Sequence, residues 1–420
     1  MRTTVETILA ICTLCAAAIA GAGPAQRATA PAVTTGLEYL IQERFAPIRG
    51  LRIGLVTNPT GVTSDLRSTI DVLAHTPGVK LAALFGPEHG VRGDAAAGEA
   101  VSNARDPATG LPVWSLYGRT KRPTAAMLRG LDALVFDMQD IGSRSYTYVT
   151  TMGNCMQSCA ESRIPFYVLD RPNPLGGDRV EGNITEPGFR SDVSAWPIAY
   201  CHGMTVGELA RMINGKGWLP GGVSCELRVI PMQGWRRSMT WEETGLPWVP
   251  TSPHIPHAGT SLFYAATGIV GELSSLSIGV GYTLPFELAG APGVGPVALA
   301  NDLNRRGLPG VTFRPMSWRP FYGAMKGRDC GGVEIHFTDT RRAELTRLNF
   351  EIMDALRRVA PSRRLFAASG EETRMFDLDC GTDKVRKAFE SGRSAADIWA
   401  MWNRDSAKFR SERQPFLLYK

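Results

Sequence analysis

The segment Phe85–Asp94, which reads FGPEHGVRGD, places a glutamate, a histidine, an arginine and an aspartate directly after an apolar run. Glu88 lies between a proline and His89, in a turn where partial burial would raise its pKa. A carboxyl group of this kind can protonate a leaving oxygen, as the acid of glycoside hydrolysis does. We therefore take Glu88 as the best candidate acid. The alternatives are a helix cap or an ion pair with Arg92.

Carboxylates also follow other apolar runs of the sequence. Asp137 and Asp140 come after ALVF, and Asp170 comes after PFYVL. Glycoside hydrolysis uses a second carboxylate as nucleophile or as the base that activates water. Each of these three aspartates is a candidate for that role or for contacts to sugar hydroxyls, and each could equally be a cap or turn residue.

Cationic and aromatic residues accompany these carboxylates. Two histidines, His89 and His202, could orient a carboxylate or bind sugar hydroxyls. Three arginines could offer guanidinium forks to a substrate carboxylate: Arg92, Arg144 and Arg171. Structural roles are open for all of them. Tyr146 and Tyr148 alternate as in an extended segment, so we expect one to face the ligand and the other the core.

Several other chemistries are disfavoured by missing motifs. The first predicted strand is not followed by G-x-G-x-x-G, and the sequence has no P-loop, no G-x-S-x-G and no H-E-x-x-H. Dinucleotide binding and serine hydrolysis are therefore disfavoured. Carboxylate chemistry with Arg, His and Tyr neighbours remains.

The elements that must position these residues alternate between short apolar strands and helices. Strands are predicted at Leu51–Asn58, Lys80–Phe85, Pro112–Tyr117, Ala133–Met138, Pro165–Asp170 and Glu226–Met232, and helices near Ser68–Ala74, Thr124–Leu131, Tyr148–Ser162 and Met204–Asn214. Apolar strands that alternate with helices predict an α/β, Rossmann-like, doubly wound parallel sheet. Ligands bind at the carboxyl ends of such strands, where the polar residues lie.

The pattern changes after a Pro/Gly/Trp-rich connection at Gly245–Gly259. Helices are predicted at Pro296–Arg306, Arg341–Val359, Thr382–Glu390 and Ala395–Arg413, with a strand at Gly332–Thr338. We read this as a second, smaller α+β domain. The predicted organisation is a signal peptide at 1–20, a flexible N-terminus at 21–35, a catalytic domain at 36–245 and a C-terminal domain at 246–420.

The signal peptide rests on the apolar run Ile8–Ala20, which follows Arg2 and ends in a small-residue site. It predicts export to the periplasm or the outside of the cell, with no stable membrane span after cleavage. The net charge of +6 is spread along the chain and forms no basic stripe, so nucleic-acid binding is disfavoured. Cys155 and Cys159 share a predicted helix face, which favours a core role.

These residues together resemble a known family, the bacterial exo-β-N-acetylmuramidases, long described as a domain of unknown function. The matching segments run from about residue 35 to 420 and include GLVTNPTGV, FGPEHGVRGD, TGLPVWSLYG, LVFDMQDIGSRSYTY, VLDRPNPLGG, HGMTVGELA, TGLPWV, PFELAGAP and FDLDCGTDKVR. The resemblance implies a Rossmann-like catalytic domain, a smaller C-terminal domain, and a site in the cleft between them. It also implies release of terminal N-acetylmuramic acid from the non-reducing ends of peptidoglycan fragments, without a cofactor.

The resemblance also assigns residues. The family's proposed catalytic glutamate falls on Glu88, with His89, Asp137 and Glu272 as further catalytic candidates. Contacts to the sugar and to its lactyl carboxylate would come from the other motif residues: Asn58, Arg92, Asp94, Gln139, Asp140, Arg144, Tyr146, Asp170, Arg171, Asn173, His202 and His254.

The chain departs from the family pattern after the connection between the two predicted domains. Where the family has S-P-N, E-G-T-N and G-R-G-T, this chain has an altered residue in each: His254, Ser275 and Val280. Loss of an arginine at position 280 removes a fork that could bind the lactyl group, so another sugar is an open alternative. Glu272 is retained.

Three functional hypotheses follow. The first is an exported exo-glycosidase that acts on peptidoglycan-derived saccharides or muropeptides. The second is a non-catalytic binder of such fragments, suggested by the altered segments. The third is a hydrolase that uses a divalent metal held by Asp137, Asp140, Asp170 and His202, although no strong metal spacing supports it.

Overall fold

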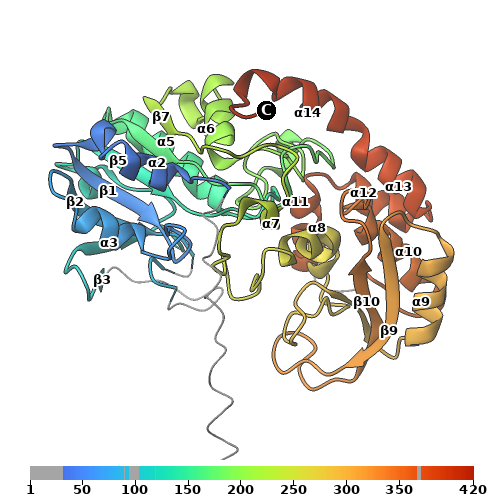
Figure 1. Cartoon of the computed structure of the whole chain (residues 1–420). Coiled ribbons are helices and arrows are strands. Elements are labelled where there is room, and N and C mark those ends of the chain that lie inside the picture. Colours follow the sequence, from blue (N-terminus) through green and yellow to red (C-terminus); the bar gives the residue numbers. More distant parts are fainter. Residues whose placement is uncertain (1–31, 89, 94–103, 119, 367–369) are drawn as a thin grey trace, which may run out of the picture. The chain divides into compact units, whose positions relative to one another are not determined.

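The structure, a computed structural model, describes residues 32–88, 90–93, 104–118, 120–366 and 370–420 (Figure 1). The predicted signal peptide, most of the predicted flexible N-terminus, His89 and Asp94 lie outside these residues. The described chain from Ala32 to Lys420 forms one compact unit that contains two sheets.

The larger sheet has seven strands in the order β3-β4-β2-β1-β5-β6-β7. Their bounds are β1 Arg52–Thr57, β2 Lys80–Gly86, β3 Ala104–Arg105, β4 Pro112–Ser115, β5 Ala133–Asp137, β6 Phe166–Leu169 and β7 Leu227–Ile230. All neighbouring pairs are parallel except β3 with β4 at one edge. The prediction of a doubly wound, mostly parallel sheet is confirmed.

Two apolar clusters cover the two faces of this sheet, because successive side chains of a strand point to opposite faces. Leu134 and Phe136 of β5 belong to the cluster that contains helices α5 (Tyr148–Ser162) and α6 (Val206–Gly215). Val135 between them belongs to the other cluster, under α2 (Gly36–Gln42) and α3 (Thr69–Ala74). Since both faces are buried, the strands read as continuous apolar runs.

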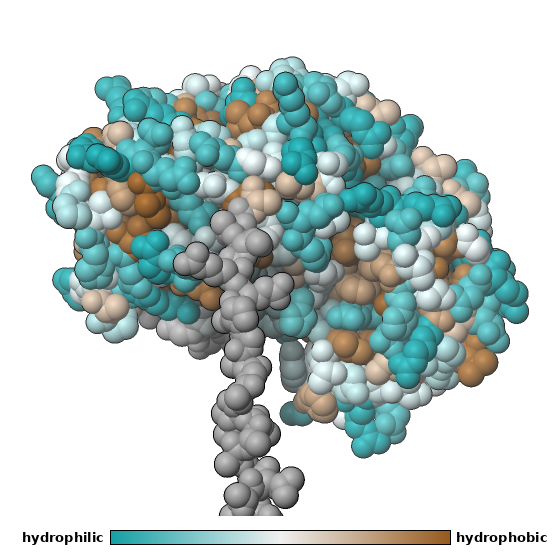
Figure 2. Space-filling view, viewed as in Figure 1, coloured by the Kyte–Doolittle hydropathy of each residue, from teal (hydrophilic) through white to brown (hydrophobic). Residues whose placement is uncertain are grey.

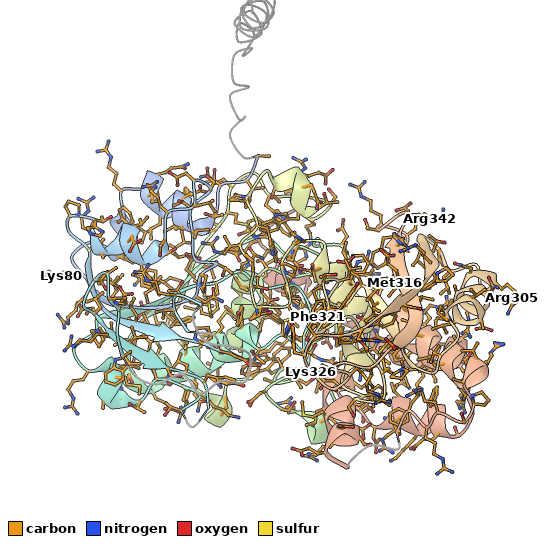
Figure 3. The ribbon with its side chains drawn as sticks, turned by 90° about the horizontal axis from the view of Figure 1, so that it is seen from below. Lys80, Arg305, Met316, Phe321, Lys326 and Arg342 are labelled. Carbon is orange, nitrogen blue, oxygen red and sulfur yellow. The ribbon has the colours of Figure 1, made fainter. Side chains whose placement is uncertain are left out.

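The carboxyl ends of the parallel strands point toward the second domain. Lys80, the first residue of β2, lies at the far end of the larger sheet, whereas Arg305 lies at the far end of the second domain (Figures 1 and 3). The register pairs Thr57 with Asp137, so β1 and β5 end together. Polar residues that follow different strands are thereby collected at one edge.

The second domain is built on an antiparallel sheet in the order β8-β10-β9. Its strands are β8 Leu288–Pro292, β9 Val311–Trp318 and β10 Cys330–Phe337. The short helix α7, Trp241–Thr244, precedes this domain, and the helices that follow are α8 Thr260–Gly271, α9 Pro296–Arg305, α10 Arg347–Val359, α11 Gly370–Cys380, α12 Lys384–Glu390, α13 Ala395–Trp402 and α14 Ser406–Glu412. A smaller α+β domain is therefore confirmed, while the predicted boundary near residue 245 stays a prediction.

Some predicted elements differ from the structure. The helix predicted at Ala395–Arg413 is interrupted by a 3₁₀ turn at Asn403–Asp405, and the one near Thr124–Leu131 is only the short α4, Ala125–Leu128. β8, β9, α8 and α11 were not predicted. β9 contains Pro315 and buries only Phe313 and Trp318 fully, so a search for apolar runs does not find this strand.

Hydrophilic residues cover most of the face shown in Figure 2, with smaller hydrophobic patches among them. Within the described residues, no helix combines the length and the apolar character needed to cross a bilayer. The six cysteines of this part of the chain are buried thiols, and Cys155 and Cys159 lie on the buried face of α5 and belong to the core, as predicted.

Candidate functional site

A pocket of roughly 440 Å³ lies beside Glu88 at the carboxyl edge of the large sheet. Glu88 follows β2, Tyr117 follows β4, and Thr147, Thr150 and Asn154 come from the start of α5. The Glu88 carboxylate lies beside the Tyr117 hydroxyl, and it raises the pKa of Tyr117 in addition to the effect of burial. A carboxyl group and a phenolic hydroxyl thus share one pocket wall.

Two tyrosines connect Glu88 to the interior. Tyr146 and Tyr148 are packed edge to face, with ring centroids 4.8 Å apart. Tyr146 Oη donates to Thr251 Oγ1 at 2.8 Å, and the Tyr148 hydroxyl donates to the Thr251 carbonyl. Burial raises the pKa of Tyr148, and the Glu88 carboxylate adds to this shift. The expectation that one tyrosine faces the ligand and the other the core is wrong, because the chain turns into α5 at this point and both rings are buried.

Asn58, which follows β1, lies in the same region. Its Oδ1 accepts hydrogen bonds from the amide and hydroxyl of Thr60, at 3.0 Å and 2.5 Å. Its buried Nδ2 has no hydrogen-bond partner among the described residues. The Asn58 side chain also faces Tyr148, since its amide opposes the rise in the pKa of that tyrosine. The role of Asn58 in substrate binding stays a prediction.

Asp140 is the aspartate that is best placed for chemistry. Its Oδ1 accepts a hydrogen bond from Gly142 N at 2.7 Å, while the buried Oδ2 has no hydrogen-bond partner in the described part of the chain. Burial raises the pKa of Asp140 to about 7, and its carboxylate contributes to the raised pKa of Tyr146. Gly142 has a φ of +84°, and a Cβ there would lie 2.2 Å from Asn173 Oδ1, so this turn requires glycine. Asp140 and Glu88 both lie next to the tyrosine pair.

Asp137 is instead engaged in a structural ion pair. Arg171 donates to its two carboxylate oxygens at 2.5 Å and 2.9 Å, and Thr69 Oγ1 donates to Oδ2 at 2.5 Å. Both charged side chains are buried. Because protein groups saturate the carboxylate and hold the guanidinium, the structure does not place either residue to bind a substrate.

Asp170, Asn173 and His202 are also held by protein partners. Asp170 accepts from Thr205 Oγ1, Gly207 N and Tyr419 Oη at 2.6 to 2.8 Å. Asn173 donates to the carbonyl of Met204. Burial, and then Arg413, lowers the pKa of His202 to about 3, so its imidazole is neutral.

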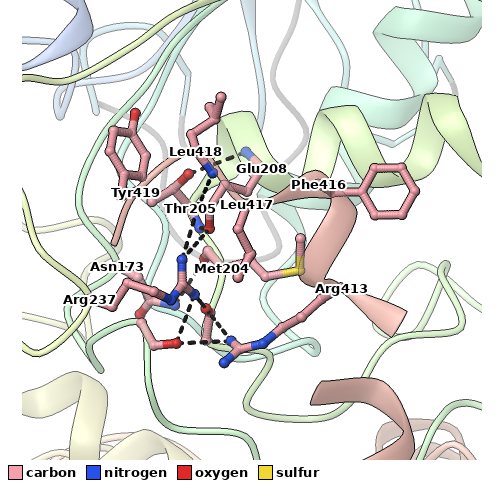
Figure 4. A network of polar contacts seen from close by, with 12 residues as sticks. Asn173, Met204, Thr205, Glu208, Arg237, Arg413, Phe416, Leu417, Leu418 and Tyr419 are labelled. Carbon is pink, nitrogen blue, oxygen red and sulfur yellow. Dashed lines mark hydrogen bonds and ion pairs between the residues drawn. The ribbon is translucent and has the colours of Figure 1, made fainter. Parts of the chain in front are cut away.

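The C-terminal segment completes this network (Figure 4). Leu418 N donates to Glu208 Oε1 at 2.8 Å, and Arg237, in the loop between β7 and α7, donates to the same carboxylate. Arg413 donates to the carbonyls of His202 and Gly203. These contacts hold the Asp170 carboxylate and the backbone at His202, whereas His202 Nε2 has no hydrogen-bond partner among the described residues; the assignment of the two residues to substrate contacts stays a prediction.

The two other arginines proposed as carboxylate forks have protein partners as well. Arg92 Nε donates to Asp106 Oδ1 at 2.8 Å, and this pair lowers the pKa of Asp106 to about 2. Arg144 is buried and donates to four backbone carbonyls, at Asn183, Ile198, Asp379 and Cys380. Gln139 Nε2 likewise bonds the carbonyls of Asp140 and Pro172. These side chains shape the loops around the site.

Glu272 forms a carboxylate pair that sequence reasoning missed. It follows α8, and its partner Asp379 lies in the last turn of α11. Burial raises the pKa of both groups, and the charge of Glu272 raises that of Asp379 further. Ser145 links this region to the tyrosines, since its hydroxyl lies 3.1 Å from Tyr264 Oη. The signal in the sequence was the position of Asp379 between Leu378 and Cys380, because an acidic residue among apolar neighbours in a helix indicates a buried carboxyl group.

Other missed residues line the Glu88 pocket. Lys121 and Asp192 form an exposed ion pair at its edge, and both line it. Within the described residues, Lys121 is the cation that lines this pocket. Lys121 could not be predicted from the sequence, since it lies in a loop without a motif. His254 is placed in a different setting, against Tyr322, with ring centroids 5.8 Å apart.

A larger pocket of roughly 740 Å³ lies elsewhere, between loops of both domains. Its walls include Arg179, Trp241, Arg342 and Trp399, and none of the residues predicted from the sequence lines it. We assign the site to the smaller pocket because Glu88, the best candidate acid, lines it at the carboxyl edge of the parallel sheet. Among the described residues, no group of three or more His, Cys, Asp or Glu side chains is arranged to hold a metal ion.

Comparisons with known proteins agree with this organisation. Models of the N-terminal and C-terminal parts of the exo-β-N-acetylmuramidase NamZ family match residues 53–259 and 262–419. The chain is 41% identical over 394 residues to the peptidoglycan β-N-acetylmuramidase NamZ of Bacillus subtilis strain 168, covering 94% of this chain and 93% of that protein. Crystal structures of two DUF1343 family proteins from Bacteroides fragilis NCTC 9343 are similar. One has a TM-score of 0.89 and 46% identity over 93% of this chain and all of that chain. The other has a TM-score of 0.75 and 31% identity over 92% and 99%.

Proposed function

Because the chain belongs to the exo-β-N-acetylmuramidase family and is a glycoside hydrolase, we propose that it releases terminal N-acetylmuramic acid from peptidoglycan fragments. The observation that carries this proposal is the pocket beside Glu88. It lies at the carboxyl edge of the parallel sheet, where α/β proteins bind ligands. Its volume of roughly 440 Å³ suits one amino-sugar ring with its substituents.

In this proposal Glu88 protonates the oxygen of the leaving sugar. A proton delivered to that oxygen makes it a neutral leaving group, so less charge develops as the glycosidic bond breaks. Asp140 supplies the second carboxyl group, in place of Asp137, because Asp137 is saturated by Arg171 and Thr69. Asn58 Nδ2 is a donor for a sugar oxygen or for the acetamido carbonyl.

Recognition of the lactyl carboxylate falls to Lys121. Arg92, Arg144 and Arg171 are all bound to protein groups, whereas Lys121 is paired with Asp192 at the exposed edge of the pocket. An exposed ion pair contributes little stability, so a substrate carboxylate can replace Asp192 at small cost. This arrangement favours N-acetylmuramic acid over N-acetylglucosamine, which lacks the carboxylate.

The test is the variant Glu88→Gln, assayed for release of N-acetylmuramic acid from a disaccharide of N-acetylmuramic acid and N-acetylglucosamine. We expect an unchanged fold and a loss of about 10²- to 10⁴-fold in kcat. Glu161→Gln is the matched control, since Glu161 is an exposed residue of α5 paired with Arg122. Full activity of Glu88→Gln would remove Glu88 from the mechanism, and tight binding without turnover by the wild type would favour a binding protein.

We also propose that the activity lies outside the cytoplasm. The support is the predicted signal sequence at residues 1–20, followed by the Ala/Pro/Gly-rich stretch to about residue 35. Cell fractionation with mass determination of the N-terminus tests this. A full-length protein confined to the cytoplasm would contradict it.

A further inference from the structure

Four aromatic side chains form an exposed cluster on the second domain. Tyr322 is stacked on His254, and the two side chains are joined by a hydrogen bond of 2.9 Å between Tyr322 Oη and His254 Nε2. Phe321 is packed against Tyr282, with centroids 5.5 Å apart. We call His254, Tyr282, Phe321 and Tyr322 the aromatic platform. Phe321 and Tyr322 are 62% and 47% exposed, which is unusual for large apolar residues.

The loops that carry the platform are braced against each other. Gly281 O accepts a hydrogen bond from Phe321 N at 2.6 Å, and Gly327 N donates to Pro320 O. Gly281 has a φ of +91°, and a Cβ there would lie 2.2 Å from Tyr322 O. This close approach of two backbones requires glycine and fixes the two loops together. The rings are therefore held in place before any ligand binds, which lowers the entropic cost of binding.

One connection from the platform to the site runs through the chain itself. Thr251 accepts hydrogen bonds from both tyrosines next to Glu88, and His254 is only three residues further on. Three residues of extended chain span at most about 11 Å. The platform therefore begins within that distance of Thr251.

A second connection runs through packed rings. Tyr264 is packed edge to face against Tyr146, at 5.9 Å, and against Phe286, at 5.0 Å. Phe286 closes the turn that carries Tyr282, because Phe286 N donates to Ile278 O at 2.7 Å. In Figure 3, Phe321 lies on the side of the second domain turned toward the large sheet, and Arg305 on the opposite side. Packed rings thus connect the platform, which is exposed, with the buried tyrosines of the site.

This surface suits the face of a sugar ring. The C–H groups on one face of a pyranose are weakly positive, and they lie favourably on the negative face of an aromatic ring. The buried polar groups near Glu88 suit a sugar that is enclosed, whereas the exposed platform suits a sugar that stays partly in water. An enzyme that removes terminal sugars needs the second kind of contact for the rest of the glycan.

We propose that the aromatic platform is a subsite for the sugar on the leaving side of the bond that is cleaved, an N-acetylglucosamine ring of the peptidoglycan strand. This inference rests on the proposed function. Two of the positions at which the chain departs from the family pattern, His254 and Val280, lie in or beside the platform. The platform is accordingly a feature of this chain, which sets how it holds the glycan behind the terminal residue.

The experiment compares two substrates that differ only on the leaving side. The β-fluoride of N-acetylmuramic acid leaves a single atom, whereas its disaccharide with N-acetylglucosamine leaves a sugar. We expect Phe321→Ala with Tyr322→Ala to lower kcat/KM for the disaccharide by about 3- to 10-fold, and to leave hydrolysis of the fluoride unchanged. Val297→Ala, at a 61% exposed residue of α9, is the control and leaves both rates unchanged.

The outcomes are separable. If the wild type hydrolyses neither substrate, the proposed function itself is wrong. If the wild type hydrolyses both and the double variant loses the same factor on each, or nothing, the platform is not a subsite. Phe321→Leu with Tyr322→Leu keeps the apolar bulk without the aromatic faces; it must show the same selective loss, and equal activity to wild type would also overturn the proposal.

Discussion

The guanidinium of Arg171 lies inside the protein against the carboxylate of Asp137, with contacts of 2.5 Å and 2.9 Å to its two oxygens. The pair joins the end of β5 to the loop after β6, and Arg171 also donates to the carbonyl of Val62 after β1. Three strand ends are thereby fixed in relation to one another. The pair supports the site and takes no part in binding.

We expect Arg171→Ala to lower the free energy of unfolding by about 3–5 kcal/mol, because it leaves the Asp137 charge buried without its partner. Denaturant unfolding measures this. Arg228→Ala removes an exposed pair with Glu226 and is expected to cost about 1 kcal/mol or less. A stable Arg171→Ala protein with a raised KM would show that Arg171 binds substrate after all.

Asp140→Asn is expected to change how stability depends on pH. The pKa of Asp140 is raised to about 7, so the native state holds its proton while the unfolded state loses it above about pH 4. The wild type therefore loses stability as the pH rises toward 7, by on the order of a few kcal/mol, and the asparagine removes this loss. The Tm difference, variant minus wild type, should increase between pH 5 and 8.

Asp329→Asn serves as the control for that series, because Asp329 is exposed and its substitution should give a flat Tm difference. A flat difference for Asp140→Asn as well would show that its carboxyl group is not held protonated. Activity measured on the same variant should fall, since the second carboxyl group is lost.

Lys121→Gln is expected to affect hydrolysis of N-acetylmuramic acid substrates but not of N-acetylglucosamine substrates. For substrates that end in N-acetylmuramic acid, KM should rise about 10-fold or more, because a charge-assisted contact to the lactyl carboxylate is lost. Any slow hydrolysis of the N-acetylglucosamine analogue should be unchanged. Lys216→Gln, at an exposed residue after α6, is the control. An equal effect on both sugars would exclude Lys121 from lactyl recognition.

The effects of Glu272→Gln and Asp379→Asn on the free energy of unfolding are expected to be coupled. Each carboxyl group disfavours ionisation of the other, so each single substitution should stabilise the protein at high pH. The double variant should gain less than the sum of the two, with a coupling on the order of 0.5–3 kcal/mol. Thermal unfolding at pH 9 measures the cycle. Strict additivity would show that the two groups do not interact.

The sequence was most informative about the large sheet, because strands buried on both faces leave unbroken apolar runs. It also located the edge where Glu88, Asn58 and Asp140 collect, since parallel strands end together. The sequence could not show which of Asp137 and Asp140 has a carboxylate that is already bound by protein groups. Both follow the same strand, and only the position of Arg171, a residue distant in the sequence, decides which carboxylate is occupied.

The functional residues of the second domain were harder to predict because they lie far apart in the sequence. Phe321 and Tyr322 lie in a loop between β9 and β10, and an exposed aromatic dipeptide has no periodic signal. Asp379 pairs with Glu272 across 107 positions of sequence, so neither residue marks the other. Such relationships depend on tertiary packing, which no local pattern encodes.

The hydrogen bond from Tyr419 to Asp170 has a consequence for synthesis of the protein. A chain growing on the ribosome completes β7 at Ile230, yet Asp170 and Glu208 receive the last of their hydrogen-bond partners from Leu418 and Tyr419. All of the strands of the large sheet therefore exist well before the segment that closes its interior. The sheet is therefore incompletely packed while the second domain is translated, because Leu418 and Tyr419 follow that domain in the sequence and yet contact the first domain.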